Sequence, residues 1–320
     1  MEVEAPTSGS DSNDVAFKMP LKLSHTLSLN QAPISCVKYS PDKKLLAVSS
    51  ADKTIIIYEA QTYSCKFILQ GHEKGVNAVA WSSDSRYLAS CSDDKTIRIW
   101  NCEKGTFVRI ISGLSHFPVS IAYNPRGSMI ACSCTDNHIY FFSVYTRALI
   151  QTIYAHASTI TSLAFSSNGS RLLSSSVDGY CRIWDCETGN CVQSLRSTSQ
   201  KTPILACCFS PNDAYVLLSL ANAHMYLWCL RDNAVEKEFA GSHSVSKFLC
   251  CCGFYVGEEQ LCMTGTEDGC VAFYSIANQK AAVLRCGEAG EIVLALDALP
   301  HGDVAVGMMG SKNQVLIYSP

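Results

Sequence analysis

The sequence predicts an all-β fold built from seven repeated units, and three regularities predict it. Aromatic residues recur every 42 to 46 positions, most are preceded by an acidic or amide residue six positions earlier, and turn-forming clusters lie eighteen positions before five of them. The aromatic residues are Tyr58, Trp100, Phe142, Trp184, Trp228, Tyr274 and Tyr318, and the residues six positions earlier are Asp52, Asp94, Asp136, Asp178, Asn222, Asp268 and Lys312. A repeat of this length with regular turn signals encodes one small β-sheet.

Each unit is expected to form four short strands. In the first unit, residues 34–39, 44–48, 54–58 and 66–69 are rich in β-branched and aromatic side chains, and the turn cluster 40–42 separates the first two. A lone four-stranded sheet leaves two open edges and buries too little surface, so such sheets stack face to face in a ring. The sequence therefore predicts a seven-bladed β-propeller.

The two ends of the chain are expected to meet in one blade. The sequence ends directly after the third strand of the seventh unit, whereas residues 21–29 have strand character and precede the first unit. We expect this early segment to supply the missing outer strand and close the ring. Residues 21–320 would then form the propeller, and residues 1–20 an acidic, polar and disordered tail.

Composition argues against several classes of function. Lys and Arg number 25 against 28 Asp and Glu, so no basic surplus favours binding to nucleic acid or to a membrane surface. The 18 cysteines contain no CxxC pair and are expected to fill core volume as small apolar residues in a reducing compartment. The longest apolar run, 248–256, is shorter than a membrane-spanning helix, and the first residues do not resemble a secretory signal.

The repeats resemble the WD-repeat family. The likeness rests on Gly71-His72 and its variants at residues 115–116, 155–156 and 242–243, and on Trp184-Asp185. It implies that a histidine, a serine, an aspartate and a tryptophan of one blade form a hydrogen-bonded chain; the residues concerned are His72, Ser90, Asp94 and Trp100 in blade 2, and His156, Ser174, Asp178 and Trp184 in blade 4.

Recurrence of these sets at a fixed phase favours a structural role over a catalytic triad. The hydrolase, phosphate-loop, dinucleotide and zinc-protease motifs GxSxG, GxxxxGK[ST], GxGxxG and HExxH are absent from the sequence. We therefore expect no catalytic residue, no cofactor and no metal site.

Residues 75–100, 175–185 and 49–53 resemble the propeller subunit shared by SET-domain (COMPASS-type) histone lysine methyltransferase complexes. The resemblance implies a nuclear, monomeric propeller that assembles with other proteins or peptide segments in a hetero-complex. It also implies a central channel mouth that binds an arginine side chain of a partner; the corresponding positions here are Ala51, Asn77, Asp93, Ser120, Val177, Phe248 and Cys251.

The channel positions depart from that pattern. Ala51 and Asp93 match, but Asn77 replaces a serine, Val177 and Phe248 replace tyrosines, and Ser120 and Cys251 replace the two stacking phenylalanines. A guanidinium held without water needs aromatic faces on both sides. The sequence therefore predicts weak or absent binding of arginine peptides.

The same resemblance implies a second groove between blades 5 and 6 for a short apolar and acidic segment. Asn212, Leu227 and Val256 match it, while Ala277 replaces a glutamine. Leu227 and Val256 are equally consistent with ordinary strand residues.

Several functions remain open at this stage. The first is a chromatin-associated assembly subunit. The second is a substrate receptor of a cullin-type ubiquitin ligase, for which Trp228-Cys229-Leu230-Arg231 keeps the Trp and Arg of a Trp-Asp-x-Arg signal but not its Asp. The third is a cytoplasmic scaffold for signalling or RNA processing, and an enzyme is the least favoured, because propellers host many unrelated tasks.

Overall fold

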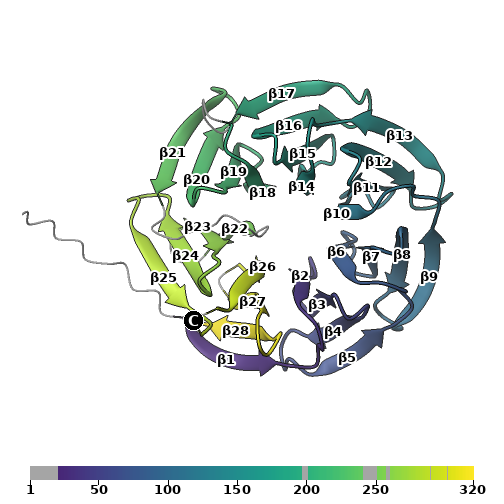
Figure 1. Cartoon of the computed structure of the whole chain (residues 1–320), viewed down its shortest axis with the longest axis horizontal. Coiled ribbons are helices and arrows are strands. Elements are labelled where there is room, and N and C mark those ends of the chain that lie inside the picture. Colours follow the sequence, from purple (N-terminus) through teal and green to yellow (C-terminus); the bar gives the residue numbers. More distant parts are fainter. Residues whose placement is uncertain (1–20, 197–200, 241–250, 257–259, 289, 301) are drawn as a thin grey trace, which may run out of the picture.

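A computed structural model describes residues 21–196, 201–240, 251–256, 260–288, 290–300 and 302–320, and these residues form a closed ring of seven blades around a central channel (Figure 1). Each blade is a four-stranded antiparallel sheet, and the described part contains strands and turns but no helix. The predicted seven-bladed β-propeller is therefore confirmed. No helix long and apolar enough to cross a membrane occurs in these ranges.

The strands of a blade follow one another from the channel outward (Figure 1). Blade 1 contains β2 (Ile34–Tyr39), β3 (Leu45–Ser50), β4 (Ile55–Glu59) and β5 (Cys65–Leu69). Blade 2 contains β6 (Val76–Trp81), β7 (Tyr87–Ser92), β8 (Thr96–Asn101) and β9 (Thr106–Ile111). Blade 3 contains β10 (Pro118–Tyr123), β11 (Met129–Cys134), β12 (His138–Ser143) and β13 (Leu149–Tyr154).

The other blades repeat this order. Blade 4 contains β14 (Ile160–Phe165), β15 (Arg171–Ser176), β16 (Tyr180–Asp185) and β17 (Cys191–Arg196). Blade 5 contains β18 (Ile204–Phe209), β19 (Tyr215–Leu220), β20 (His224–Cys229) and β21 (Ala234–Ala240). Blade 6 contains β22 (Cys252–Val256), β23 (Gln260–Gly265), β24 (Cys270–Ser275) and β25 (Ala281–Arg285), and blade 7 contains β26 (Ile292–Ala298), β27 (Val304–Met309), β28 (Val315–Ser319) and β1 (Lys22–Leu27).

The core lies between neighbouring blades. Every residue of β3 is buried, because the sheet is covered on both faces, whereas the outermost strand β5 is mostly exposed and only Leu69 at its end is buried. Ala47 and Ile57 of blade 1 pack in one cluster with Leu88 and Trp100 of blade 2. All cysteines of the described ranges are free, and many of them pack within such clusters.

The first strand closes the ring as predicted. β1 pairs antiparallel with β28, with Leu23 opposite Tyr318 and Leu27 opposite Val315. The outermost strand of blade 7 therefore comes from the start of the chain, and its other three strands come from the end (Figure 1). This pairing ties blade 7 to the segment that leads into blade 1, so the ring has no free seam.

Candidate functional site

Blades 2 and 4 each contain a hydrogen-bonded chain of four buried side chains. His72 Nδ1 lies 2.7 Å from Asp94 Oδ2, and His72 Nε2 lies 2.7 Å from Ser90 Oγ. Trp100 Nε1 donates to the same Ser90 Oγ at 2.8 Å. Blade 4 repeats this arrangement: His156 contacts Asp178 and Ser174, and Trp184 Nε1 donates to Ser174 Oγ at 2.8 Å.

These chains fix the histidines as neutral groups. Since the tryptophan N–H occupies the serine oxygen as a donor, the serine hydroxyl donates to His72 Nε2, and the proton of the ring lies on Nδ1 toward Asp94. Burial lowers the pKa of His72 and of His156, despite the neighbouring carboxylates. Burial opposes ionisation of Asp178, but its hydrogen bond from His156 and two backbone N–H groups lower its pKa to about 2. Each of these polar side chains thus has its partners within its own blade.

Blades 1 and 5 lack the serine of this chain. Val48 stands where blade 2 has Ser90, and the buried Asn30 amide and Tyr58 hydroxyl have no hydrogen-bond partner. In blade 5 the serine position is Leu218, and Trp228 Nε1 is buried without an acceptor. These blades retain the aromatic ring as apolar packing but not the polar chain, at a cost to stability.

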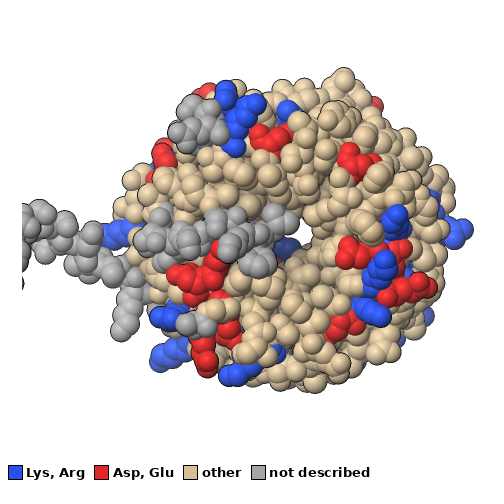
Figure 2. All heavy atoms as spheres, viewed as in Figure 1, with Lys and Arg blue, Asp and Glu red and all other residues tan. Residues whose placement is uncertain are grey.

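The innermost strands surround the central channel, which is open in Figure 2. In blades 1 to 5 a β-bulge near the start of this strand leaves one residue out of register with the next strand; these residues are Ser35, Asn77, Val119, Thr161 and Leu205. Asn77 is thus at such a position, but its counterpart in blade 3 is Val119. Ser120, the residue singled out from the sequence, instead pairs with Ser133.

The second set of channel positions lies directly before the turn aspartates. The backbone N–H of Ala51, Asp93 and Val177 each donates to a carbonyl just before the innermost strand of its own blade. Asn77 Nδ2 donates to Asp93 Oδ1 and to Pro118 O of blade 3, both at 2.7 Å. Asn77 and Asp93 therefore link two blades.

None of the channel positions that the structure describes is aromatic. Cys251 is half-buried directly before β22, and Phe248 lies outside the described residues. The described channel positions therefore offer no ring face to an arginine side chain, and weak or absent binding of arginine peptides stays a prediction.

A groove lies between blades 5 and 6, with a volume of about 260 Å³. It is lined by Ser210, Pro211, Asn212, Tyr215, Leu227, Glu236, Phe254, Tyr255, Gln260 and Ile276. Asn212 and Leu227, two of the residues singled out from the sequence, both line it. Val256 ends β22, but its side chain lies outside the described part of the chain. Ile276 of blade 6 lines the groove, whereas Ala277 does not.

The aromatic and charged residues of this groove were not predicted from the sequence. Tyr215 and Tyr255 come from the second strand of blade 5 and the first strand of blade 6, and Glu236 lies on β21. Lys237 Nζ donates to Ile276 O across the seam, which leaves Glu236 as the charged side chain of the lining. The groove is therefore apolar with an acidic rim.

The closed ring of four-stranded blades, with histidine–serine–tryptophan chains in blades 2 and 4, defines a WD-repeat β-propeller. The chain belongs to the WDR5 beta-propeller domain family, whose family model matches residues 26–319. No curated protein sequence matches the chain. A propeller of this family supports a role as a protein-interaction scaffold.

Proposed function

We propose that the protein is a non-catalytic subunit of a chromatin-modifying complex of the histone lysine methyltransferase type, and that it acts in the nucleus. The family match over residues 26–319 carries this proposal. The groove between blades 5 and 6 supports it, because Asn212 and Leu227 lie where the resemblance to the methyltransferase propeller placed a docking site.

The absence of catalysis in this proposal is supported by the state of the histidines. His72 and His156 are buried, and both ring nitrogens of each are occupied by a carboxylate and a serine hydroxyl. A catalytic triad uses the same three residue types, but its serine and histidine must reach a substrate. Here Ser90 and Ser174 are fully buried, and each accepts a hydrogen bond from a tryptophan N–H. No group of three His, Cys, Asp or Glu side chains able to hold a metal occurs in the described ranges.

Docking through the inter-blade groove, and not through the channel, follows from the two linings. The channel positions hold small and aliphatic side chains, whereas the groove has two tyrosines, a phenylalanine and a leucine. The few residues that dominate the binding energy of protein interfaces are enriched in Trp, Tyr and Arg. Because the lining contains Glu236 and no Lys or Arg, the segment that docks here is apolar with a neutral or basic flank, which differs from the apolar and acidic segment that the resemblance implies.

The test is affinity capture of the tagged full-length protein from cells, followed by identification of the co-purifying proteins. Wild type should recover a SET-domain methyltransferase and its associated subunits. Tyr215→Ser and Glu236→Lys should lower that recovery several-fold, because they remove a groove wall and reverse the rim charge.

Glu187→Lys is the matched control, since Glu187 is exposed on blade 4 and lies outside the groove. Recovery of a cullin adaptor in place of a methyltransferase would contradict the proposal. Equal recovery by wild type and both groove variants would contradict the groove assignment.

A further inference from the structure

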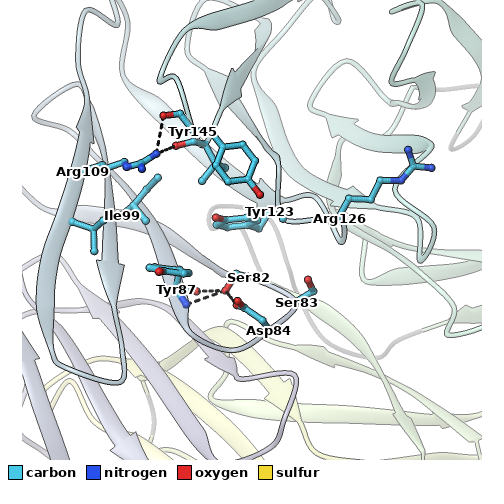
Figure 3. Close-up of a pocket in the computed structure, with 12 residues that line it drawn as sticks. Ser82, Ser83, Asp84, Tyr87, Ile99, Arg109, Tyr123, Arg126 and Tyr145 are labelled. Atoms are coloured by element: carbon cyan, nitrogen blue, oxygen red, sulfur yellow. Dashed lines mark hydrogen bonds between the residues drawn. The ribbon is translucent and has the colours of Figure 1, made fainter.

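A second cavity lies between blades 2 and 3, with a volume of about 320 Å³ (Figure 3). It is lined by Ser82, Ser83, Asp84, Tyr87, Ile99, Val108, Arg109, Tyr123, Arg126, Gly127, Val144 and Tyr145. In Figure 3 the rings of Tyr87, Tyr123 and Tyr145 lie around the hollow, and Arg126 extends beyond Tyr123. This volume is enough to receive an apolar side chain together with adjoining backbone.

This cavity is the repeat-related counterpart of the blade 5–6 groove. Ser82, Asp84, Tyr87, Ile99 and Val108 each lie 128 positions before Ser210, Asn212, Tyr215, Leu227 and Glu236, and Tyr123 and Val144 each lie 132 positions before Tyr255 and Ile276. The same positions of two successive blades thus form both hollows. The lining of one seam therefore predicts how the other binds, apart from the residues that differ.

The two seams are also bridged by equivalent hydrogen bonds. Arg109 Nη1 donates to Val144 O at 2.5 Å and to Tyr145 O at 2.8 Å. At the equivalent position of blade 5, Lys237 Nζ donates to Ile276 O. A cation on the outermost strand of one blade therefore contacts a carbonyl after the third strand of the next, and it spans the seam beside the hollow.

The blade 2–3 cavity presents hydroxyl groups without partners. Within the described ranges, the hydroxyls of Tyr87, Tyr123 and Tyr145 make no hydrogen bond, although Tyr123 is only 9% exposed. Burial, with the nearby Asp84, raises the pKa of Tyr123 to about 12, so its hydroxyl is a donor at neutral pH. The Tyr123 hydroxyl therefore faces the cavity as a free donor, and a carbonyl oxygen of a ligand could accept from it.

Charge distinguishes this cavity from its counterpart. Two arginines line it against one aspartate, and Asp84 Oδ1 already accepts from Ser82 Oγ at 2.5 Å and from Arg86 N at 3.1 Å. Arg126 is exposed and its guanidinium has no acceptor in the described part of the chain. Arg109 and Lys237 are equivalent cations of the two seams, so the grooves differ in the free Arg126 here and in Glu236 there. The two grooves therefore select different partners.

We propose that the groove between blades 2 and 3 is a second docking site, which binds an extended acidic and apolar segment of a protein partner. An apolar side chain of the segment packs against Tyr87, Ile99 and Val108. A carboxylate beside it pairs with Arg126, and a backbone carbonyl accepts from Tyr123. The site is independent of whatever occupies the blade 5–6 groove.

An immobilised array of synthetic hexapeptides tests this proposal. Each peptide carries two Asp or Glu and two Leu, Val, Ile or Phe in every order, and a matched array replaces the acids with Asn and Gln. The full-length protein should bind a subset of acidic peptides about two- to five-fold more strongly than their amide counterparts, because an exposed charge pair contributes up to about 1 kcal/mol.

Three variants locate the binding. Arg126→Glu should abolish the preference for acidic peptides, and Val108→Arg should lower binding to that subset by blocking the apolar wall; both side chains are exposed, so folding is preserved. Arg171→Glu, an exposed arginine of β15 outside both grooves, is the charge-matched control. Glu236→Lys should leave this subset unchanged, because it alters only the other groove.

The proposal is overturned if no acidic peptide exceeds its amide counterpart. It is also overturned if Arg126→Glu and Val108→Arg bind the acidic subset as wild type does, or if Arg171→Glu weakens binding as much as Arg126→Glu. Loss of binding in Glu236→Lys alone would assign the acidic peptides to the blade 5–6 groove. Each of these results is independent of which complex is captured from cells.

Discussion

Replacing Trp100 and Trp228 by phenylalanine separates the hydrogen-bonded chain from the packing that surrounds it. Both indoles lie on the third strand of their blades and are buried, at 2% and 8% exposure. Trp100 Nε1 donates to Ser90 Oγ, whereas Trp228 Nε1 has no acceptor, because Leu218 stands at the serine position. Trp100→Phe and Trp228→Phe therefore remove similar volume but differ in one hydrogen bond.

The expected difference in the free energy of unfolding follows from these contacts. Trp100→Phe loses a hydrogen bond with a net contribution of about 1 kcal/mol, and Trp228→Phe removes a buried unsatisfied donor that costs about 1 kcal/mol or more. Trp100→Phe should therefore destabilise the protein by roughly 2 kcal/mol more than Trp228→Phe. Guanidinium unfolding followed by far-ultraviolet circular dichroism measures this difference, since that signal does not depend on the indoles.

A double-mutant cycle provides the control. In a Ser90→Ala background the acceptor is gone, so Trp100→Phe should cost about as much as Trp228→Phe costs in wild type. Equal destabilisation by the two tryptophan variants in the wild-type background would show that the hydrogen bond from Trp100 to Ser90 does not stabilise the protein. A larger effect of Trp228→Phe would show the same.

Three further predictions concern the chain's pH response, closure and channel. The free energy of unfolding should fall as the pH drops below 6.5, because the depressed pKa values of His72 and His156 stabilise the fold only above that pH. Asp178 adds a further loss of ~2 kcal/mol as the pH falls from about 4 toward 2. Urea unfolding between pH 7 and pH 4 measures the first effect, and a stability that stays constant or increases as the pH falls would contradict it. Deletion of residues 20–30 should unfold the ring. Leu27→Asp places a charge at a buried position of β1 and should lower the melting temperature more than Leu23→Asp, which changes an exposed position of the same strand. Equal melting temperatures would argue against closure by β1. An arginine-containing methyltransferase peptide should bind weakly or not at all in calorimetry, and sub-micromolar affinity would show that the channel works without ring faces.

The ring could be predicted from the sequence because its signals are local. The aromatic residue, the turn aspartate and the turn cluster all lie within one blade, so their spacing gives the blade count directly. The closing strand could also be predicted, since the last unit lacks one strand and residues 21–29 lie outside any unit. The partners of His72 and Trp100 followed from the resemblance to the WD-repeat family.

The sites were harder to predict because they depend on contacts between strands and between blades. The β-bulge at the channel lies at the same phase in blades 2 and 3, so Val119, 42 positions after Asn77, and not Ser120, is at the channel position. The two grooves lie across seams, so Tyr87 and Tyr123 meet only after the blades stack. A usable signal was present in the repeat: residues lining one seam have counterparts 128 or 132 positions away in the other.

The lost polar partners of blades 1 and 5 were equally hidden. Tyr58 and Trp228 fit the spacing of the repeated aromatic residues as well as Trp100 does. Val48 and Leu218 replace the serine that would form a hydrogen bond with their polar atoms. An aromatic residue at the right phase predicts packing, whereas the hydrogen bond needs a second residue ten positions earlier.

In our proposal the closed propeller docks protein segments in its inter-blade grooves and not in its channel. Hydrogen–deuterium exchange on the complex captured from cells, compared with the free protein, tests it most directly. Slower exchange is expected in the groove segments 82–87, 123–127, 144–145, 210–215 and 254–255. Protection confined to the channel segments around residues 35, 77 and 161, with the grooves unchanged, would contradict the claim.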